Sequence, residues 1–190
     1  VRAGQISHTG GYISIGAGCT SNTPAIQIDA GIYTGSTVQI HDYGCGTGNL
    51  VQINGGISTF SGSTIVRDTT GVNTPSDILV QGALAAQVVT SNNIFYRNPT
   101  VAWVNPVIDV EAANNRATIA GNRLTGLSGG SGTFIKVAVD DWHQVIGNIS
   151  PGWSMSYPST KYYGTYQDQA ILTMDGGVIS AGGFQVLGVP

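Results

Sequence analysis

Charged residues are scarce in this chain of 190 residues: they make up 9% of it, against roughly 25% in an average soluble domain. With seven Lys and Arg and a net charge of −3, it has no basic stripe to displace counterions from phosphates, which argues against nucleic acid as a partner. No apolar run approaches the roughly 20 residues of a membrane span. No segment has a convincing apolar period of 3.6 residues, so we expect no substantial helix. The remaining choices are a surface for neutral ligands such as sugars, or one covered by sister subunits.

A short pattern of alternating apolar and polar residues returns along the chain. Ile26-Gln27-Ile28-Asp29 comes back as Val51-Gln52-Ile53-Asn54, and then more loosely four more times. Repetition at roughly 27 residues indicates stacked coils. Alternation within each repeat predicts a strand with one buried face. We expect the inward residues to form two columns: Ile26, Val51, Ile78, Ile108, Ile135 and Leu172; and Ile28, Ile53, Val80, Val110, Val137 and Met174.

A second strand is predicted in each coil, after a corner rich in Gly, Ser, Thr and Asn. The six segments are Val38–Ile40, Ile65–Val66, Val88–Val89, Thr118–Ile119, Val145–Ile146 and Phe184–Val186. The prediction is therefore an all-β fold, a right-handed parallel β-helix of six full coils plus a partial one, with two or three sheets. We expect residues 1–190 to be one β-helical domain. Because the sequence starts at Val1 with no methionine or secretory pattern, we interpret it as a fragment of a longer chain.

Cys19 and Cys45 lie about one repeat apart, so they are expected on adjacent coils about 4.8 Å apart, within disulfide reach. Buried stacked thiols are the favoured interpretation, so the cysteines do not fix the compartment. His41-Asp42 and Arg67-Asp68 follow equivalent strands and are expected to form a small surface charge cluster. No His or Cys spacing indicates a metal site, and we expect no cofactor.

Asparagines recur near the turn after the second strand, at Asn93, Asn122 and Asn148. Asn tolerates left-handed turns, and stacked side-chain amides bond along the coil axis, so we expect a structural ladder. With Gly-Asn-x-Leu and Gly-Asn-Ile after β-branched strands, the chain resembles the pectate-lyase-like right-handed β-helices. Its low charge and Gly/Ser/Thr richness most resemble bacteriophage tailspikes and related virion appendages. That resemblance implies a parallel homotrimer, located in the virion or outside the cell, which binds and often cleaves bacterial surface polysaccharide.

Asp109 and Glu111 are the first candidates for catalysis. Two residues apart on one strand, they are expected to point outward with Cα atoms about 6.7 Å apart. That overlaps the roughly 6.5–9.5 Å between the carboxyls of inverting glycosidases. Lys136, expected one coil away, would hold Asp109 ionised, so Glu111 is the predicted acid and Asp109 the base. The alternative is an ion pair on a solvated or subunit-facing sheet.

Two further groups are candidate carbohydrate sites. In Asp140-Asp141-Trp142-His143 the indole would stack on a sugar and the carboxylates would bind its hydroxyls or act in catalysis. Paired aspartates occur in the similar polygalacturonases, but Gly-His-Gly and Arg-x-Lys are absent, and Asp141 alternatively starts a tight turn. An inserted loop at 150–170 concentrates aromatic residues, and low-charge aromatic loops suit sugars or subunit contacts. Its candidates, with a residue from a shorter excursion, are Trp153, Tyr157, Tyr162, Tyr163 and Trp103.

Three functions follow as expectations. The first is a phage appendage domain that binds host polysaccharide as a homotrimer. The second is a glycosidase or lyase of the same fold, and the third is a structural spacer of an appendage or adhesin.

Overall fold

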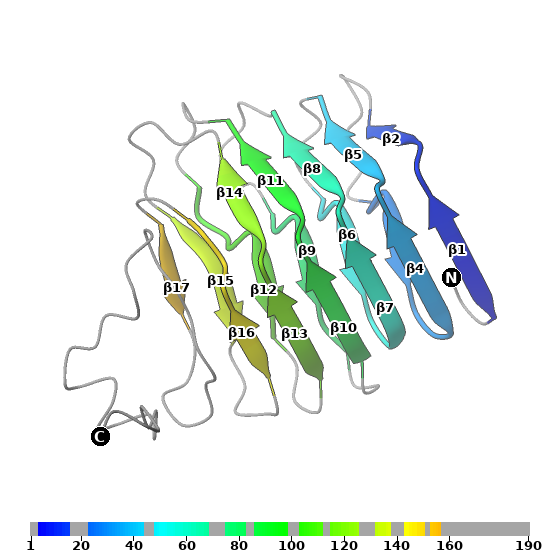
Figure 1. The fold of residues 1–190 in the computed structure, drawn as a ribbon. Coiled ribbons are helices and arrows are strands. Elements are labelled where there is room, and N and C mark those ends of the chain that lie inside the picture. Colours follow the sequence, from blue (N-terminus) through cyan, green and yellow to red (C-terminus); the bar gives the residue numbers. More distant parts are fainter. Residues whose placement is uncertain are drawn as a thin grey trace, which may run out of the picture.

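The structure is a computed structural model, which describes residues 4–15, 23–43, 48–68, 75–82, 86–98, 103–111, 115–125, 132–137, 143–150 and 153–156. These residues form seventeen strands and no helix (Figure 1). The strands make three sheets, and every pairing between them is parallel. The expected parallel β-solenoid is therefore confirmed, and it is consistent with a right-handed β-helix.

Each sheet contains every third strand in chain order, one from each coil. Sheet A contains β1 (Gln5–Thr9), β4 (Ile32–Ser36), β7 (Gly56–Ser61), β10 (Ala86–Ser91), β13 (Arg116–Ala120) and β16 (Gln144–Ile146). Sheet B contains β2 (Tyr12–Ile15), β5 (Gln39–Asp42), β8 (Thr64–Arg67), β11 (Ile94–Arg97) and β14 (Arg123–Thr125). Sheet C contains β3 (Ile26–Ile28), β6 (Val51–Ile53), β9 (Ile78–Val80), β12 (Ile108–Val110), β15 (Thr133–Val137) and β17 (Ser154–Ser156).

The described residues make about four complete turns, each with one strand from sheets C, A and B in that order. The first complete turn is β3-β4-β5 and the fourth is β12-β13-β14, with partial turns before and after them (Figure 1). The predicted count of six full coils was too high. Part of that count depended on Leu172, Met174 and Phe184–Val186, which lie outside the described residues, as do Cys19 and Cys45.

The two inward columns of sheet C are confirmed as far as Ile135 and Val137. Strand pairing aligns Ile26, Val51, Ile78, Ile108 and Ile135, and likewise Ile28, Ile53, Val80, Val110 and Val137. All ten side chains are buried. The next place beside Ile135 is taken by Met155 of β17, where the sequence prediction put Leu172. Part of the segment interpreted as an inserted loop at 150–170 therefore continues sheet C.

The predicted second strand merged two different sheets. Of the predicted segments, Gln39–Ile40 and Ile65–Val66 belong to sheet B, and Val38 comes just before it. Val88–Val89, Thr118–Ile119 and Val145–Ile146 belong to sheet A. Val88 pairs with Ser58 of β7 and not with a residue of β8. Each coil therefore has three strands. The sheet A strands β4 and β7 were not predicted, because alternation alone did not reveal them.

The asparagine ladder is confirmed at the corner between sheets A and B. Asn93 Nδ2 donates to Asn122 Oδ1 at 3.0 Å, and Asn122 Nδ2 donates to Asn148 Oδ1 at 2.9 Å. Each Nδ2 also donates to the carbonyl of a sheet A strand, and all three side chains are fully buried. The residue before each has a left-handed backbone, with φ of 53° to 64° at Asn92, Gly121 and Gly147. The ladder thus satisfies the polar groups of a buried corner.

A second buried polar system joins sheets B and C. Strand pairing stacks Asp42, Arg67 and Arg97, and all three are buried, so the expected surface charge cluster is wrong for Asp42 and Arg67. Arg67 Nε donates to Asp77 Oδ1 at 2.8 Å and its Nη1 to Asp42 Oδ2 at 3.3 Å. Arg97 Nε donates to Asp77 Oδ2 at 3.2 Å. Two cations face two carboxylates, so this interior is electrically balanced.

Candidate functional site

A row of mostly polar side chains, interrupted by Leu79, lies on the outer face of sheet C. Strand pairing aligns Gln27, Gln52, Leu79, Asp109 and Lys136 across five coils, and Lys136 lies one coil from Asp109 as predicted. A second row follows the strand ends, where Asn54, Gln81 and Glu111 each donate a backbone hydrogen bond to the coil below. The sheet C polar face is defined here as Gln27, Asp29, Gln52, Asn54, Gln81, Asp109, Glu111 and Lys136.

Hydrogen bonds between side chains order the first half of this face. Gln27 Nε2 donates to Asp29 Oδ1 at 2.8 Å, and Asn54 Nδ2 donates to the same oxygen at 2.7 Å from the next coil. Gln52 Nε2 donates to Asn54 Oδ1 at 3.1 Å. Because these groups hold one another, a ligand that binds them encounters amides whose positions are already fixed, which lowers the entropy lost on binding.

The second half of the face is a charge cluster of Asp109, Glu111 and Lys136. Lys136 Nζ lies 3.3 Å from Asp109 Oδ1 and 3.7 Å from Glu111 Oε1. Asp109 is only 3% exposed, whereas 46% of the Glu111 side chain is exposed. Burial raises the pKa of Asp109 to about 6, against the opposing effect of Lys136 and with a further contribution from Glu111. Lys136 therefore does not keep the pKa of Asp109 low, as the sequence predicted, and the roles of acid and base stay a prediction.

The position of Lys136 bears on the glycosidase interpretation. An inverting pair needs space between its carboxyls for a water molecule and the scissile oxygen. Here the ammonium group contacts both carboxylates. Asp109, buried on the outer face, also has little surface from which to reach a substrate. This arrangement suits the binding of polar groups better than proton transfer to a glycosidic oxygen.

Two predicted sugar-stacking tryptophans lie in the interior. Trp103 is 5% exposed and Trp153 is fully buried. The Arg97 guanidinium lies over both rings, 4.5 Å from the Trp103 centroid and 5.8 Å from that of Trp153. Trp103 Nε1 also donates to the Asn98 carbonyl at 2.9 Å. These indoles cover a buried cation, and neither presents a ring face for a sugar to stack on.

The other predicted residues are separated from this face or cannot be placed. His143 is buried just before β16 in sheet A, where its Nδ1 accepts a hydrogen bond from the Ala117 amide at 3.2 Å. It does not join the Asp109 cluster on sheet C. The remaining candidates, Asp140, Asp141, Trp142, Tyr157, Tyr162 and Tyr163, lie outside the described residues.

Sequence reasoning missed an aromatic cluster at one end of sheet B. The His41 and Tyr43 rings stack with centroids 3.7 Å apart, and the Tyr12 hydroxyl contacts the Tyr43 hydroxyl. Desolvation, together with that contact, raises the pKa of Tyr12 to about 12. Tyr12 and Tyr43 remain about half exposed. The strand register could have revealed this cluster. It pairs Ser14 with His41, so Tyr12 lies on the coil next to His41 and Tyr43.

In the described part of the chain, no group of His, Asp or Glu is arranged to hold a metal ion. The same residues include no helix of the length and apolar character needed to cross a membrane. No family model, curated protein or solved structure matches this chain.

Proposed function

We propose that the sheet C polar face binds a polysaccharide laid along the solenoid axis. We also propose that the chain is a segment of an appendage of the phage tailspike kind, which attaches a virion to the surface polysaccharide of its bacterial host. The observation that carries the proposal is the group of three amides and one carboxylate, Gln27, Gln52, Asn54 and Asp29, that hydrogen-bond one another across two neighbouring coils. Support for the virion location is the resemblance of the sequence alone.

The geometry of such a row suits an extended glycan. Adjacent coils place equivalent side chains about 4.8 Å apart, which is close to the length of one hexose unit in a stretched chain. Side-chain amides both donate and accept, so they match sugar hydroxyls, which do the same. The low charge of the chain favours neutral ligands over strongly ionic ones. A rigid row of this kind reads several sugar units in sequence.

The proposed homotrimer is supported by the low content of charged residues and by exposed apolar side chains. Ile32 and Ile57 are neighbours on the outer face of sheet A and are 39% and 42% exposed, and Ile94 on sheet B is 47% exposed. Contact between subunits would remove such side chains from water. Sedimentation velocity at micromolar concentration should give a species of three chains, and a monomer would contradict this part of the proposal.

The binding proposal is tested by retention on immobilised bacterial surface polysaccharides. Gln52→Ala removes one amide from the middle of the row and its bond to Asn54, so we expect about a fivefold to tenfold loss of affinity for the retained polysaccharide. Gln39→Ala is the matched control, because Gln39 is an exposed amide on the outer face of sheet B. Equal losses in both variants, or no retention on any polysaccharide tested, would contradict binding at this face. The second result favours the spacer function.

The pKa of Asp109 keeps hydrolysis as a second candidate function. A carboxyl that titrates near pH 6 can donate a proton at neutral pH. Size-exclusion chromatography of the retained polysaccharide after incubation shows whether it is shortened. If it is, Asp109→Asn should abolish the shortening, whereas full activity of that variant removes Asp109 from the mechanism.

A further inference from the structure

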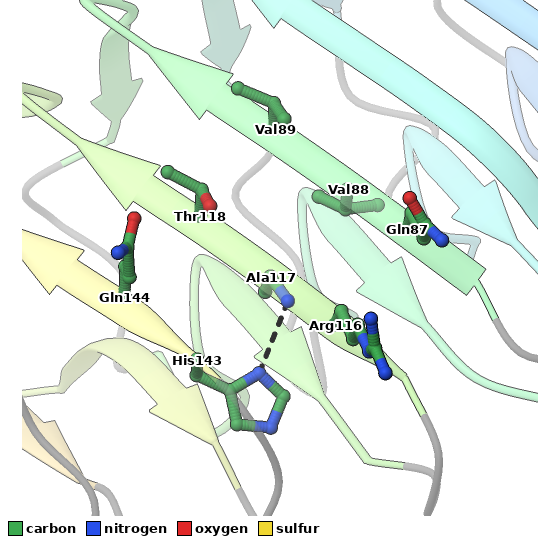
Figure 2. Close-up of a pocket in the computed structure, with 8 residues that line it drawn as sticks. All are labelled: Gln87, Val88, Val89, Arg116, Ala117, Thr118, His143 and Gln144. Atoms are coloured by element: carbon green, nitrogen blue, oxygen red, sulfur yellow. Dashed lines mark hydrogen bonds between the residues drawn. The ribbon is translucent and has the colours of Figure 1, made fainter.

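A pocket of about 360 Å³ lies over β10, β13 and β16 of sheet A (Figure 2). Its lining includes Gln87, Val89, Arg116, Thr118, His143 and Gln144. One water molecule takes about 30 Å³ of liquid volume, so the pocket is far larger than a single ion requires. Its size falls at the lower end of the range for small-molecule sites. The volume fits a ligand of about one sugar ring.

The strand register explains how the pocket is arranged. Gln87 pairs with Arg116 across β10 and β13, and in the next outward column Val89, Thr118 and Gln144 follow one another. The two columns are two residues apart, or about 6.7 Å along the strands. Gln87, Arg116 and Gln144 are exposed, whereas Val89 and Thr118 are half-buried. Figure 2 shows Gln87 and Arg116 on one side of the pocket and Gln144 on the other, with Thr118 between them and Val89 at the edge.

His143 forms the end of the pocket. The ladder between β13 and β16 begins at Thr118 and Gln144. One residue earlier, the Ala117 amide donates to the imidazole Nδ1 in place of a strand carbonyl (Figure 2). Since Nδ1 accepts this bond, the neutral ring carries its proton on Nε2. The side chain thus replaces a piece of backbone pairing and fixes the wall beside Arg116.

Arg116 gives the pocket its charge. Within the described residues Arg116 forms no ion pair, and no Asp or Glu of that part of the chain lines the pocket. A guanidinium is a planar fork of donors that matches a carboxylate with two parallel hydrogen bonds. An exposed cation beside two amides is therefore suited to an anionic group that also carries hydroxyls.

We propose that this pocket binds the carboxylate-bearing ring of an acidic sugar, a hexuronic acid unit. Arg116 binds the carboxylate, the Gln87 and Gln144 amides bind ring hydroxyls, and Val89 with the Thr118 methyl contacts the apolar face of the ring. The site shares no residue with the sheet C polar face, so it stands whether or not that face binds a glycan.

The first test is a titration of the full chain with sodium glucuronate, followed by amide chemical shifts. We expect saturable binding with a dissociation constant of the order of millimolar, and shifts centred on Arg116, Thr118 and Gln144. Glucose and acetate serve as separate ligands. Glucose that binds as tightly as glucuronate would overturn the role of the carboxylate, and acetate that binds as tightly would overturn recognition of the sugar ring.

The second test replaces the cation. Arg116→Gln should weaken glucuronate binding about tenfold or more, and Arg116→Lys should give an intermediate affinity because a single ammonium cannot match both oxygens. Arg123→Gln is the matched control, since it removes the same charge from an exposed position on β14 of sheet B. Equal losses of glucuronate affinity in Arg116→Gln and Arg123→Gln would show that the effect comes from net charge alone, and would overturn the site. Thermal unfolding of each variant shows that it is folded.

The two proposals fail separately. If the sheet C polar face does not bind polysaccharide, Gln52→Ala is retained as well as the original chain. If the pocket does not bind the acidic sugar, Arg116→Gln keeps the glucuronate affinity of the original chain, and this measurement uses a monosaccharide and needs no polymer.

Discussion

At the scale of single residues, burial determines the protonation of Asp109. Its pKa is raised from 3.8 to about 6, although Lys136 lies within 3.3 Å. The folded state therefore binds a proton more tightly than the unfolded chain does. Between about pH 4 and pH 6 the folded protein holds more protons, so this group makes stability fall as the pH rises through that window.

We predict that Asp109→Asn removes this dependence. At pH 7 the variant should be more stable than the original chain by the order of 1–2 kcal/mol, because an uncharged amide avoids the desolvation of a buried carboxylate. At pH 4, where Asp109 is protonated, the two should be nearly equal. Urea unfolding at several pH values measures both differences.

Asp68→Asn is the control for that experiment, because Asp68 is an exposed carboxylate that forms no ion pair among the described residues. Parallel profiles for Asp109→Asn and the original chain would show that Asp109 does not titrate in this window.

The buried charges show where residue-level prediction fails. Arg67 and Arg97 come at strand ends, and charged side chains are almost never fully buried unless they are paired. Their shared partner Asp77 lies just before β9, ten residues from Arg67, outside the alternating pattern that defined the coils. Only the folded path brings these residues together, and the same packing takes Trp103 and Trp153 away from the surface.

At the scale of elements, the asparagine ladder supports the corner between sheets A and B. Asn122 Oδ1 accepts from both the backbone amide and the side chain of Asn93, and its Nδ2 donates to the Thr90 carbonyl and to Asn148. Removing this amide leaves donors and acceptors buried without partners. Each such group costs about 1–3 kcal/mol.

We predict that Asn122→Ala lowers the free energy of unfolding by about 3 kcal/mol or more. Asn92→Gly is the control, because it changes the residue beside the ladder at a left-handed position that glycine adopts readily. The control should change stability by less than about 1 kcal/mol. Chemical denaturation measures both, and similar small effects would mean that the corner does not depend on the ladder.

Elements differed in how well the sequence revealed them. Sheet C was predictable because its inward positions are all large and apolar, such as Ile28, Ile53 and Val80. Sheet A was not, because its inward columns include Ser58, Gly35 and Thr90. The polar row on sheet C followed from the register, whereas the pocket at Arg116 required knowing that His143 takes the place of a backbone partner.

At the scale of the whole molecule, stability is passed from each coil to its neighbours. In the described residues β1 pairs only with β4 and β2 only with β5, whereas β7 and β8 are paired on both sides. In a stack of this kind the end repeats have one interface and the middle repeats have two. The end coils should therefore open first.

We predict that amide hydrogen exchange in β1 and β2 is at least about tenfold faster than in β7 and β8. Exchange followed by NMR or mass spectrometry measures this. Equal protection of β1 and β7 would contradict a free end and show that another chain covers that edge.

The stacked ions between sheets B and C have a consequence for how the chain finds its fold. Coils so alike invite an error in which one is skipped and the next takes its place, and a wholly apolar interior would tolerate it. Arg67 forms ion pairs with both Asp42 and Asp77. If a coil were skipped, Arg67 would be buried without one of these carboxylates, which would be strongly destabilising. The ion pairs among Asp42, Arg67, Asp77 and Arg97 therefore favour the correct order of coils over a misaligned one.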